Sequence, residues 1–151
     1  MKRHPNLREF SDDHHGGLVQ ALRLRRAASG TGEEPTEGAR AFLEFWREDT
    51  APHFRKEEEV LLPVAAIHAG ELLDREPVLE MLVQHARIRG LAMRLGGEAE
   101  RGKVQGETLR RLGELLEAHI RLEERVVFPL IEESLSERAL REVADRLAVF
   151  D

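Results

Sequence analysis

The sequence repeats one eleven-residue pattern, which restricts the chain to folds in which two segments present the same polar groups. Residues 53–63 read HFRKEEEVLLP and residues 119–129 read HIRLEERVVFP, with identity at the histidine, the arginine, two glutamates, the valine and the proline. Each copy places a glutamate four residues after a histidine, giving the pairs His53 with Glu57 and His119 with Glu123. Residues four apart lie on one face of a helix, so each copy would present two metal ligands side by side.

Apolar residues recur at helical spacing along most of the chain, and proline, glycine and capping residues divide them into runs. The predicted helices are 11–29, a run from near Thr36 to Pro63 bent at Pro52, a run capped by Asp74 that fades near Gly97, a run from near Gly106 to Pro129 or slightly beyond, and a last helix capped by Ser136 that ends near Val149. Residues 64–73 fit either a short helix or a loop, and Pro63 could stop the second helix or only bend it. No stretch alternates with the period of a strand. We therefore expect an all-α fold, an up-down-up-down four-helix bundle with an additional short C-terminal helix.

Length and composition exclude several classes of protein. A chain of 151 residues is expected to form a single domain, residues 1–151. It contains no cysteine, so any metal must be held by nitrogen and oxygen atoms. The formal net charge is -6 with no basic stripe, which argues against nucleic acid as a partner. No apolar run approaches the ~20 residues of a membrane helix, and no signal peptide opens the chain. We expect no membrane association and a cytoplasmic location; the sequence does not indicate the oligomeric state.

The first and third predicted helices each carry a histidine close to their start. Apolar residues follow at offsets of three, six and seven if these histidines are His15 and His85. This register favours His15 over His14, which would lie about 100° away around the helix. In an antiparallel bundle, the starts of these helices lie level with the ends of the second and fourth. All four histidines should therefore converge within about 9 Å along the bundle, at 1.5 Å per residue.

Each of these residues alone has an ordinary explanation, because polar pairs at this spacing are common on exposed helices. Together they do not, since four buried imidazoles beside several carboxylates would be costly without a partner. The set predicts a site for iron, manganese or zinc, with room for two ions bridged by carboxylates. Glu58 and Glu124 each follow their histidine by five residues, and could face the same cavity, bridge metals or meet solvent. His4 and His68 are predicted not to be ligands.

These residues resemble the hemerythrin-like family of histidine/histidine/glutamate cation-binding domains. The resemblance rests on four segments spread over most of the chain: DHHGGL at 13–18, HFRKEEEVLLP at 53–63, QHARIRGL at 84–91 and HIRLEERVVFP at 119–129. It implies a four-helix bundle around two non-haem iron ions, bridged by carboxylates and an oxo or hydroxo group, with one iron open to dioxygen. Zinc or manganese could substitute for iron. The ligands implied by the resemblance are His15 or His14, His53, Glu57, His85, His119 and Glu123.

The sequence departs from the oxygen-carrying members of that family in two places. The carriers have two histidines four residues apart on the third helix, but Arg89 stands four residues after His85. One metal would then lose an imidazole, and Glu58, Glu124 or water would replace it. The carriers also end with an aspartate five residues after its histidine, whereas this chain offers Glu123 at four and Glu124 at five. A site richer in carboxylates favours ferric iron and disfavours reversible oxygen carriage. Reaction with dioxygen, peroxide or nitric oxide is the expectation instead.

The leading hypothesis is a di-iron protein that binds or senses dioxygen or a related diatomic such as nitric oxide, or that handles iron. Such a chain would be a binding protein rather than an enzyme. The alternatives are iron storage or donation for the repair of iron centres, a substrate-oxidising di-iron enzyme, and a metal-free helical signalling module such as a histidine phosphotransfer bundle. Phosphotransfer requires a single exposed histidine, and the repeated Glu-x-x-His arrangement of ferritin-like oxidases is absent.

Overall fold

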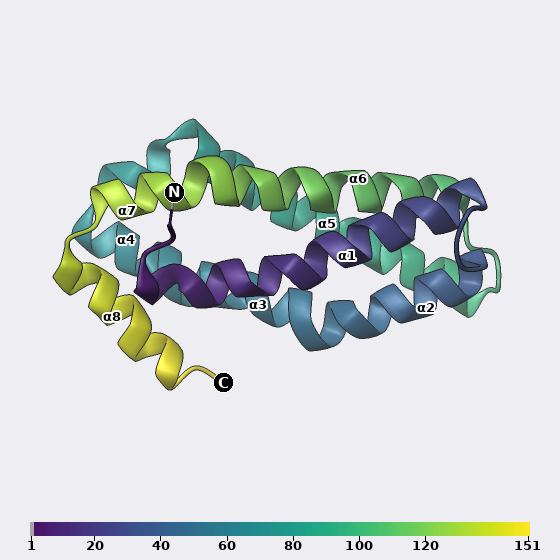
Figure 1. Cartoon of the computed structure of the whole chain (residues 1–151), viewed down its shortest axis with the longest axis horizontal. Helices are drawn as coiled ribbons and strands as arrows, with labels where there is room; N and C mark the ends of the chain where they lie inside the picture. The colour runs from purple at the N-terminus through teal and green to yellow at the C-terminus, as the bar shows by residue number, and fades with distance from the viewer. Residues whose placement is uncertain (1) are drawn as a thin grey trace.

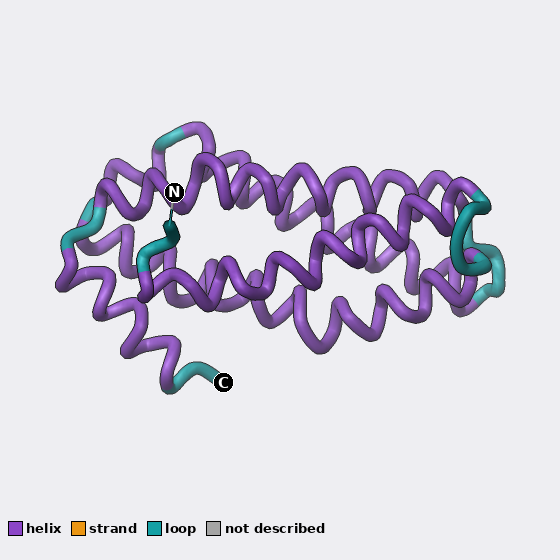
Figure 2. The backbone as a smooth tube through the Cα atoms, viewed as in Figure 1, coloured by secondary structure: helices purple, strands orange, loops and turns teal. Residues whose placement is uncertain are grey.

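The chain is mostly helical in the part that the structure, a computed structural model, describes. That part is residues 2–151, and it contains no strand (Figure 2). The all-α prediction is therefore confirmed. Three of the helical stretches are single helices: α1 (Arg8–Ser29), α5 (Glu76–Glu100) and α8 (Glu137–Ala148). None of the helices formed by residues 2–151 is long and apolar enough to cross a membrane.

Two further stretches join α-helical and π-helical segments without a break. The first consists of α2 (Pro35–Phe45), η2 (Trp46–Thr50), α3 (Ala51–Lys56), η3 (Glu57–Leu61) and α4 (Leu62–His68). The second consists of α6 (Gly106–Leu122), η5 (Glu123–Val127) and α7 (Phe128–Ser134). The π-helical segments are η2, η3 and η5, while two 3-10 turns, η1 (Pro5–Leu7) and η4 (Gly70–Asp74), precede α1 and α5.

A proline follows each π-helical segment by two residues, and the three prolines are Pro52, Pro63 and Pro129. In a regular α-helix, the proline ring collides with the carbonyl group four residues back and removes one hydrogen bond. Here the residue before the proline donates its N–H group five residues back, as Leu62 does to the carbonyl oxygen of Glu57. The wider turn accommodates the proline. For this reason Pro63 does not stop its helix, which continues to His68.

The predicted helix ends are partly correct. Ser136 caps α8, and its Oγ accepts a hydrogen bond of 3.1 Å from the N–H group of Ala139. Asp74 does not cap α5, because it closes the turn η4 and leaves Arg75 as the N-cap. The ambiguous residues 64–73 are mostly helical: they contain the end of α4 and, after Ala69, most of the 3-10 turn η4.

Buried polar residues lie between two apolar clusters. The long helices run side by side, with α6 packed against α1 and α5, and α8 lies at one end (Figure 1). One cluster gathers near α4, α7 and α8 and includes Phe10, whereas the other gathers around α2 and α6 and includes Ala21. On α1, His14 lies between these two residues. The apolar clusters therefore enclose the polar site from both ends.

Gly113 sets the close approach of α1 and α6, and its replacement tests this packing. A Cβ atom there would lie 2.9 Å from the carbonyl oxygen of Ala21. We expect Gly113→Ala to lower the free energy of unfolding by about 1–3 kcal/mol, because the backbone must shift. Gly90→Ala is the matched control: Gly90 lies inside α5 with open space around it, so helix propensity should give a gain of up to about 1 kcal/mol. Urea denaturation measures both, and equal effects would contradict the proposed contact.

Candidate metal centre

Six polar side chains are buried together between the apolar clusters. Four are histidines, one from each of the four longest helical stretches, and two are glutamates from π-helical segments. They are His14, His53, Glu57, His85, His119 and Glu123, each with 0 to 6% of its surface exposed. The predicted convergence of histidines and glutamates is thus present in the structure.

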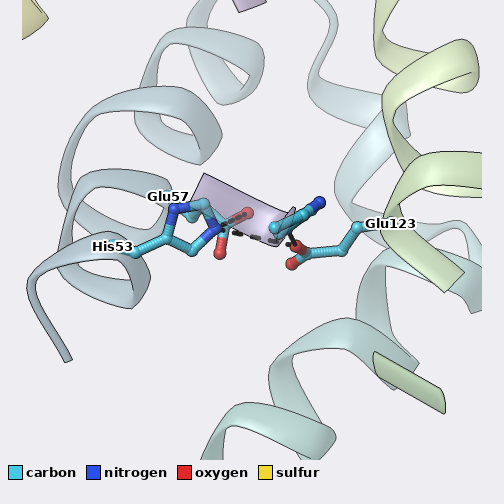
Figure 3. A group of neighbouring side chains, drawn as sticks. His53, Glu57 and Glu123 are labelled. Atoms are coloured by element: carbon cyan, nitrogen blue, oxygen red, sulfur yellow. Dashed lines mark hydrogen bonds and ion pairs between the residues drawn. The ribbon is translucent and has the colours of Figure 1, made fainter. Parts of the chain in front are cut away.

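Glu57 stands between two imidazoles. Its Oε2 lies 3.3 Å from Nε2 of His53, and its Oε1 lies 3.2 Å from Nε2 of His85. Figure 3 shows His53 and Glu57 on one helix, directed toward Glu123 on another. The carboxylate of Glu57 therefore faces one histidine from its own helix and one from a neighbour.

Glu123 lies close to all four imidazoles. Its Oε1 is 2.8 Å from Nε2 of His14 and 3.9 Å from Nε2 of His53. Its Oε2 is 3.0 Å from Nε2 of His119 and 3.5 Å from Nε2 of His85. This carboxylate is therefore central to the cluster.

The six side chains divide into two groups that share both glutamates. The first group is His14, His53, Glu57 and Glu123, and the second is His85, His119, Glu57 and Glu123. Within each group the potential ligand atoms lie within 4.8 Å of one another. Each group offers two imidazole nitrogens and two carboxylate oxygens. Two adjacent ions with shared carboxylates fit this geometry, which is a common arrangement in helical bundles.

Several atoms of the cluster have no hydrogen-bond partner among the described residues. They are Nε2 of His53, His85 and His119, both carboxylate oxygens of Glu57, and Oε2 of Glu123. Burying such groups unpaired costs at least about 1–3 kcal/mol each. Because the unpaired atoms face one another and are all good ligands for a divalent metal, the residues fit a metal site.

Each histidine is also held from outside the cluster, through its second ring nitrogen. The Nδ1 atoms of His14, His53, His85 and His119 lie 2.7, 3.0, 2.6 and 2.8 Å from side-chain oxygens of Glu124, Asp13, Glu58 and Gln84, respectively. These oxygens only accept, so Nδ1 carries the proton and donates it. The lone pair of Nε2 is thereby directed toward the centre, as metal-binding histidines require.

Two arginines hold the outer glutamates. The Arg89 guanidinium donates to both carboxylate oxygens of Glu58, at 3.1 and 3.0 Å. The Arg3 guanidinium donates to the carboxylate of Glu124 at 2.9 Å. Arg89, four residues after His85, therefore belongs to neither group of potential ligands but fixes the partner of His85.

Phenylalanine rings cover two of the imidazoles. Phe54 is stacked on His85, with ring centroids 3.9 Å apart and an interplanar angle of 10°. Phe128 is stacked on His14 at 5.5 Å and 1°. These rings limit rotation of the histidines and exclude water from one side of the cluster.

A cavity of about 210 Å³ borders the cluster. Three of the cluster histidines, His14, His53 and His119, form part of its wall, together with Gly16, Gly17 and apolar side chains including Phe45 and Ile120. Asp12, Asp13 and Asp49 also line it. The cluster is thus reached by a space large enough for a small molecule.

The structure places three of the predicted site residues outside the cluster. It brings His14 into the cluster and leaves His15 exposed, so the preference for His15 is wrong. The buried side of α1 includes Gly17, at which a Cβ would lie only 2.7 Å from Ile120, and a glycine gives no apolar signal in a sequence pattern. Glu58 and Glu124 lie outside both ligand groups and hold imidazoles instead.

Sequence reasoning gave no role to Asp13 and Gln84. Each directly precedes a cluster histidine and accepts a hydrogen bond from a histidine of the repeated motif, His53 or His119. Their shared position, directly before a cluster histidine, is the only feature of the sequence that could have indicated a role for them. Which histidine each one contacts depends on the distances between helices.

The buried charges shift the pKa values of the cluster. Burial lowers the pKa of His14, but hydrogen bonds to Glu123 and Glu124 outweigh it and raise the pKa to about 9. Burial also lowers the pKa of His85, but the adjacent carboxylates of Glu123 and Glu57 outweigh it and raise the pKa to about 9. Burial opposes ionisation of Glu123, but the surrounding imidazoles hold its pKa well below the usual value. Protons on the histidines therefore compensate the carboxylates when no metal does.

These shifts predict how the metal-free protein responds to pH. The pKa of His14 and of His85 is about 9 when folded, against an ordinary value of 6.5. Their contribution to stability is therefore complete below about pH 6.5 and is lost as the pH rises through about 9. Urea denaturation of the metal-free protein should show a falling free energy of unfolding across this range. A rise over the same range would contradict the assigned charges.

A sequence comparison agrees with the geometry. The family model described as the hemerythrin HHE cation-binding domain matches residues 6–131 and, in a second overlapping match, residues 76–148. No curated protein and no solved structure gives a significant match. Since the first match alone covers most of the chain, this protein belongs to the hemerythrin HHE cation-binding domain family.

Proposed function

We propose that the two ligand groups bind two iron ions that share Glu57 and Glu123. Family membership supports cation binding, and the buried imidazole and carboxylate atoms without partners support a site built for it. A set of nitrogen and oxygen ligands suits iron, with manganese and zinc as the competing metals. The ligands are then His14 and His53 for one ion and His85 and His119 for the other, with both glutamates common to the two.

The function we propose for the centre is binding or sensing of dioxygen or a related diatomic such as nitric oxide. The observation that carries this proposal is the cavity of about 210 Å³ against His14, His53 and His119, because it gives a small molecule room beside the ligand groups. Iron held by imidazoles and carboxylates supplies the capacity to bind such molecules and to exchange electrons with them. The complete burial of Glu57 and Glu123 supports retained rather than donated metal.

The surrounding residues have defined parts in this function. Asp13, Glu58, Gln84 and Glu124 keep the Nδ1 protons in place and so orient the four imidazoles. Phe54 and Phe128 shield two of the rings from water. This shielding would limit access to the bound metal to small molecules that enter through the cavity.

We also propose that residues 1–151 form one domain, with the long helical stretches arranged as an up-down-up-down bundle and α8 added outside. The support is that all four long stretches contribute to one cluster. Cytoplasmic location remains a prediction from the sequence.

Metal analysis tests the proposed centre. We expect about two iron ions per chain after anaerobic reconstitution with ferrous iron, and near-ultraviolet absorption of ferric iron on exposure to air. His53→Ala combined with His119→Ala removes one imidazole from each ligand group and should abolish binding of both ions. The control is His15→Ala with His68→Ala, since both of these histidines are exposed.

Nitric oxide separates the functions of the centre. A spectral change on adding nitric oxide to the ferrous protein, without loss of iron, supports ligand binding. Release of iron to a chelator within seconds would favour iron donation. Unchanged metal content in the double His53 and His119 variant would refute the proposed centre.

A further inference from the structure

The two ligand groups are related by an approximate twofold correspondence within the chain. The repeated motif that contains His53 corresponds to the motif that contains His119, and α1 with His14 corresponds to α5 with His85. Each group combines the histidine of one motif with the histidine of one single helix. Both groups use the same two carboxylates, so their inner ligands are chemically equal.

The correspondence extends to two of the four residues that accept Nδ1 protons, Glu124 and Glu58. On one side, Arg3 donates to Glu124, which accepts the Nδ1 proton of His14. On the other side, Arg89 donates to Glu58, which accepts the Nδ1 proton of His85. Both sides thus place an arginine on a glutamate that holds a histidine, so the residue types at these outer positions do not distinguish the two groups.

The other two residues that accept Nδ1 protons, Asp13 and Gln84, do not correspond. The Nδ1–H of His53 donates to a carboxylate oxygen of Asp13 at 3.0 Å, whereas the Nδ1–H of His119 donates to the amide oxygen of Gln84 at 2.8 Å. Gln84 in turn donates from its Nε2 to Glu80 at 3.3 Å. A carboxylate acceptor makes the imidazole a stronger base than an amide does, and it adds a negative charge next to the bound cation.

Access to solvent differs in the same direction. The cavity wall includes both histidines of the first group, His14 and His53, but only His119 of the second group. His85 lies under the stacked ring of Phe54 instead. An ion that arrives through the cavity therefore meets the first group before the second.

We propose that the two metal positions are unequal, and that the position between His14 and His53 fills first and binds its ion more tightly than the position between His85 and His119. Asp13 and Gln84 are the positioning residues that set this order. The inference rests on the proposed function only in requiring that both groups bind an ion. It predicts a form with one ion per chain at limiting metal, with that ion in the group next to the cavity.

Stepwise titration of the metal-free protein with Co²⁺ under anaerobic conditions tests the order, using a competing chelator and the visible spectrum as readouts. The wild-type chain should bind two ions in two resolved steps. His85→Ala damages only the second group and should retain the tighter step, whereas His53→Ala damages only the first and should retain the weaker step. The two single-histidine variants should differ in affinity by about 10-fold or more.

The outer residues are tested by changes that leave every ligand in place. Asp13→Asn keeps the hydrogen-bond acceptor but removes its charge, and should weaken the first step by about 10- to 100-fold with little effect on the second. Asp12→Asn is the matched control, because Asp12 lines the same cavity and bonds to no histidine. It removes the same charge one residue away and should change neither step by more than about twofold.

A charge-conserving exchange tests the other side. Glu80→Gln with Gln84→Glu moves the carboxylate onto the Nδ1 proton of His119 without changing net charge, and should strengthen the second step by about 10-fold. Glu80→Gln alone is its control. Far-ultraviolet circular dichroism of each metal-free variant establishes that it is folded, and the exchange tests the idea independently should Asp13→Asn fail to fold.

The possible failures are distinguishable. Fewer than two ions per wild-type chain would refute the dinuclear centre and the inference together. Two ions with equal steps, or equal effects of Asp13→Asn and Asp12→Asn, would refute the inference alone.

Discussion

The structure depends on two carboxylates that have no access to water. Glu57 and Glu123 are completely buried, and an isolated charge in such a place costs several kcal/mol or more. The fold can retain them only because imidazoles from four helical stretches converge on them. In the metal-free protein the neighbouring carboxylates raise the pKa of His14 and of His85, so protons on these imidazoles can balance the charge. Metal ions would replace these protons, so metal binding and folding stability are coupled through the same two side chains.

The π-helical backbone at Glu57 and Glu123 contributes to placing their side chains in the cluster. Both begin π-helical segments, and the carbonyl oxygens of Glu57 and Glu123 accept hydrogen bonds from residues five positions ahead. Adjacent residues on a helix point about 100° apart, which lets two successive glutamates serve different purposes. The first of each pair enters the cluster, while the second, Glu58 or Glu124, holds a histidine of another helix. The repeated motif therefore encodes both an inner ligand and an outer support.

The sequence alone predicted the helical fold and most of the cluster, because both depend on periodicity. Histidines and glutamates four residues apart must share a helix face whatever surrounds them. The choice between His14 and His15 could not be made this way, since it depends on Gly17 facing α6 closely. The outer partners Asp13 and Gln84 could not be predicted for a related reason. Each accepts a hydrogen bond from a histidine of a different helix, and only the packed structure defines that distance.

The inner ligands alone cannot distinguish the two metal positions, since each has two imidazoles and the same two carboxylates. Any difference must come from groups outside them, and these groups lie in segments remote in sequence. The outer groups that the two positions have in common are just as remote: Arg3 precedes the first helix, yet it pairs with Glu124 and also with Glu132. Its neighbour His4 contacts Glu137 at the start of α8. The N-terminal segment thus ties the outer support of His14 to the last two helices, which makes their packing part of the metal site.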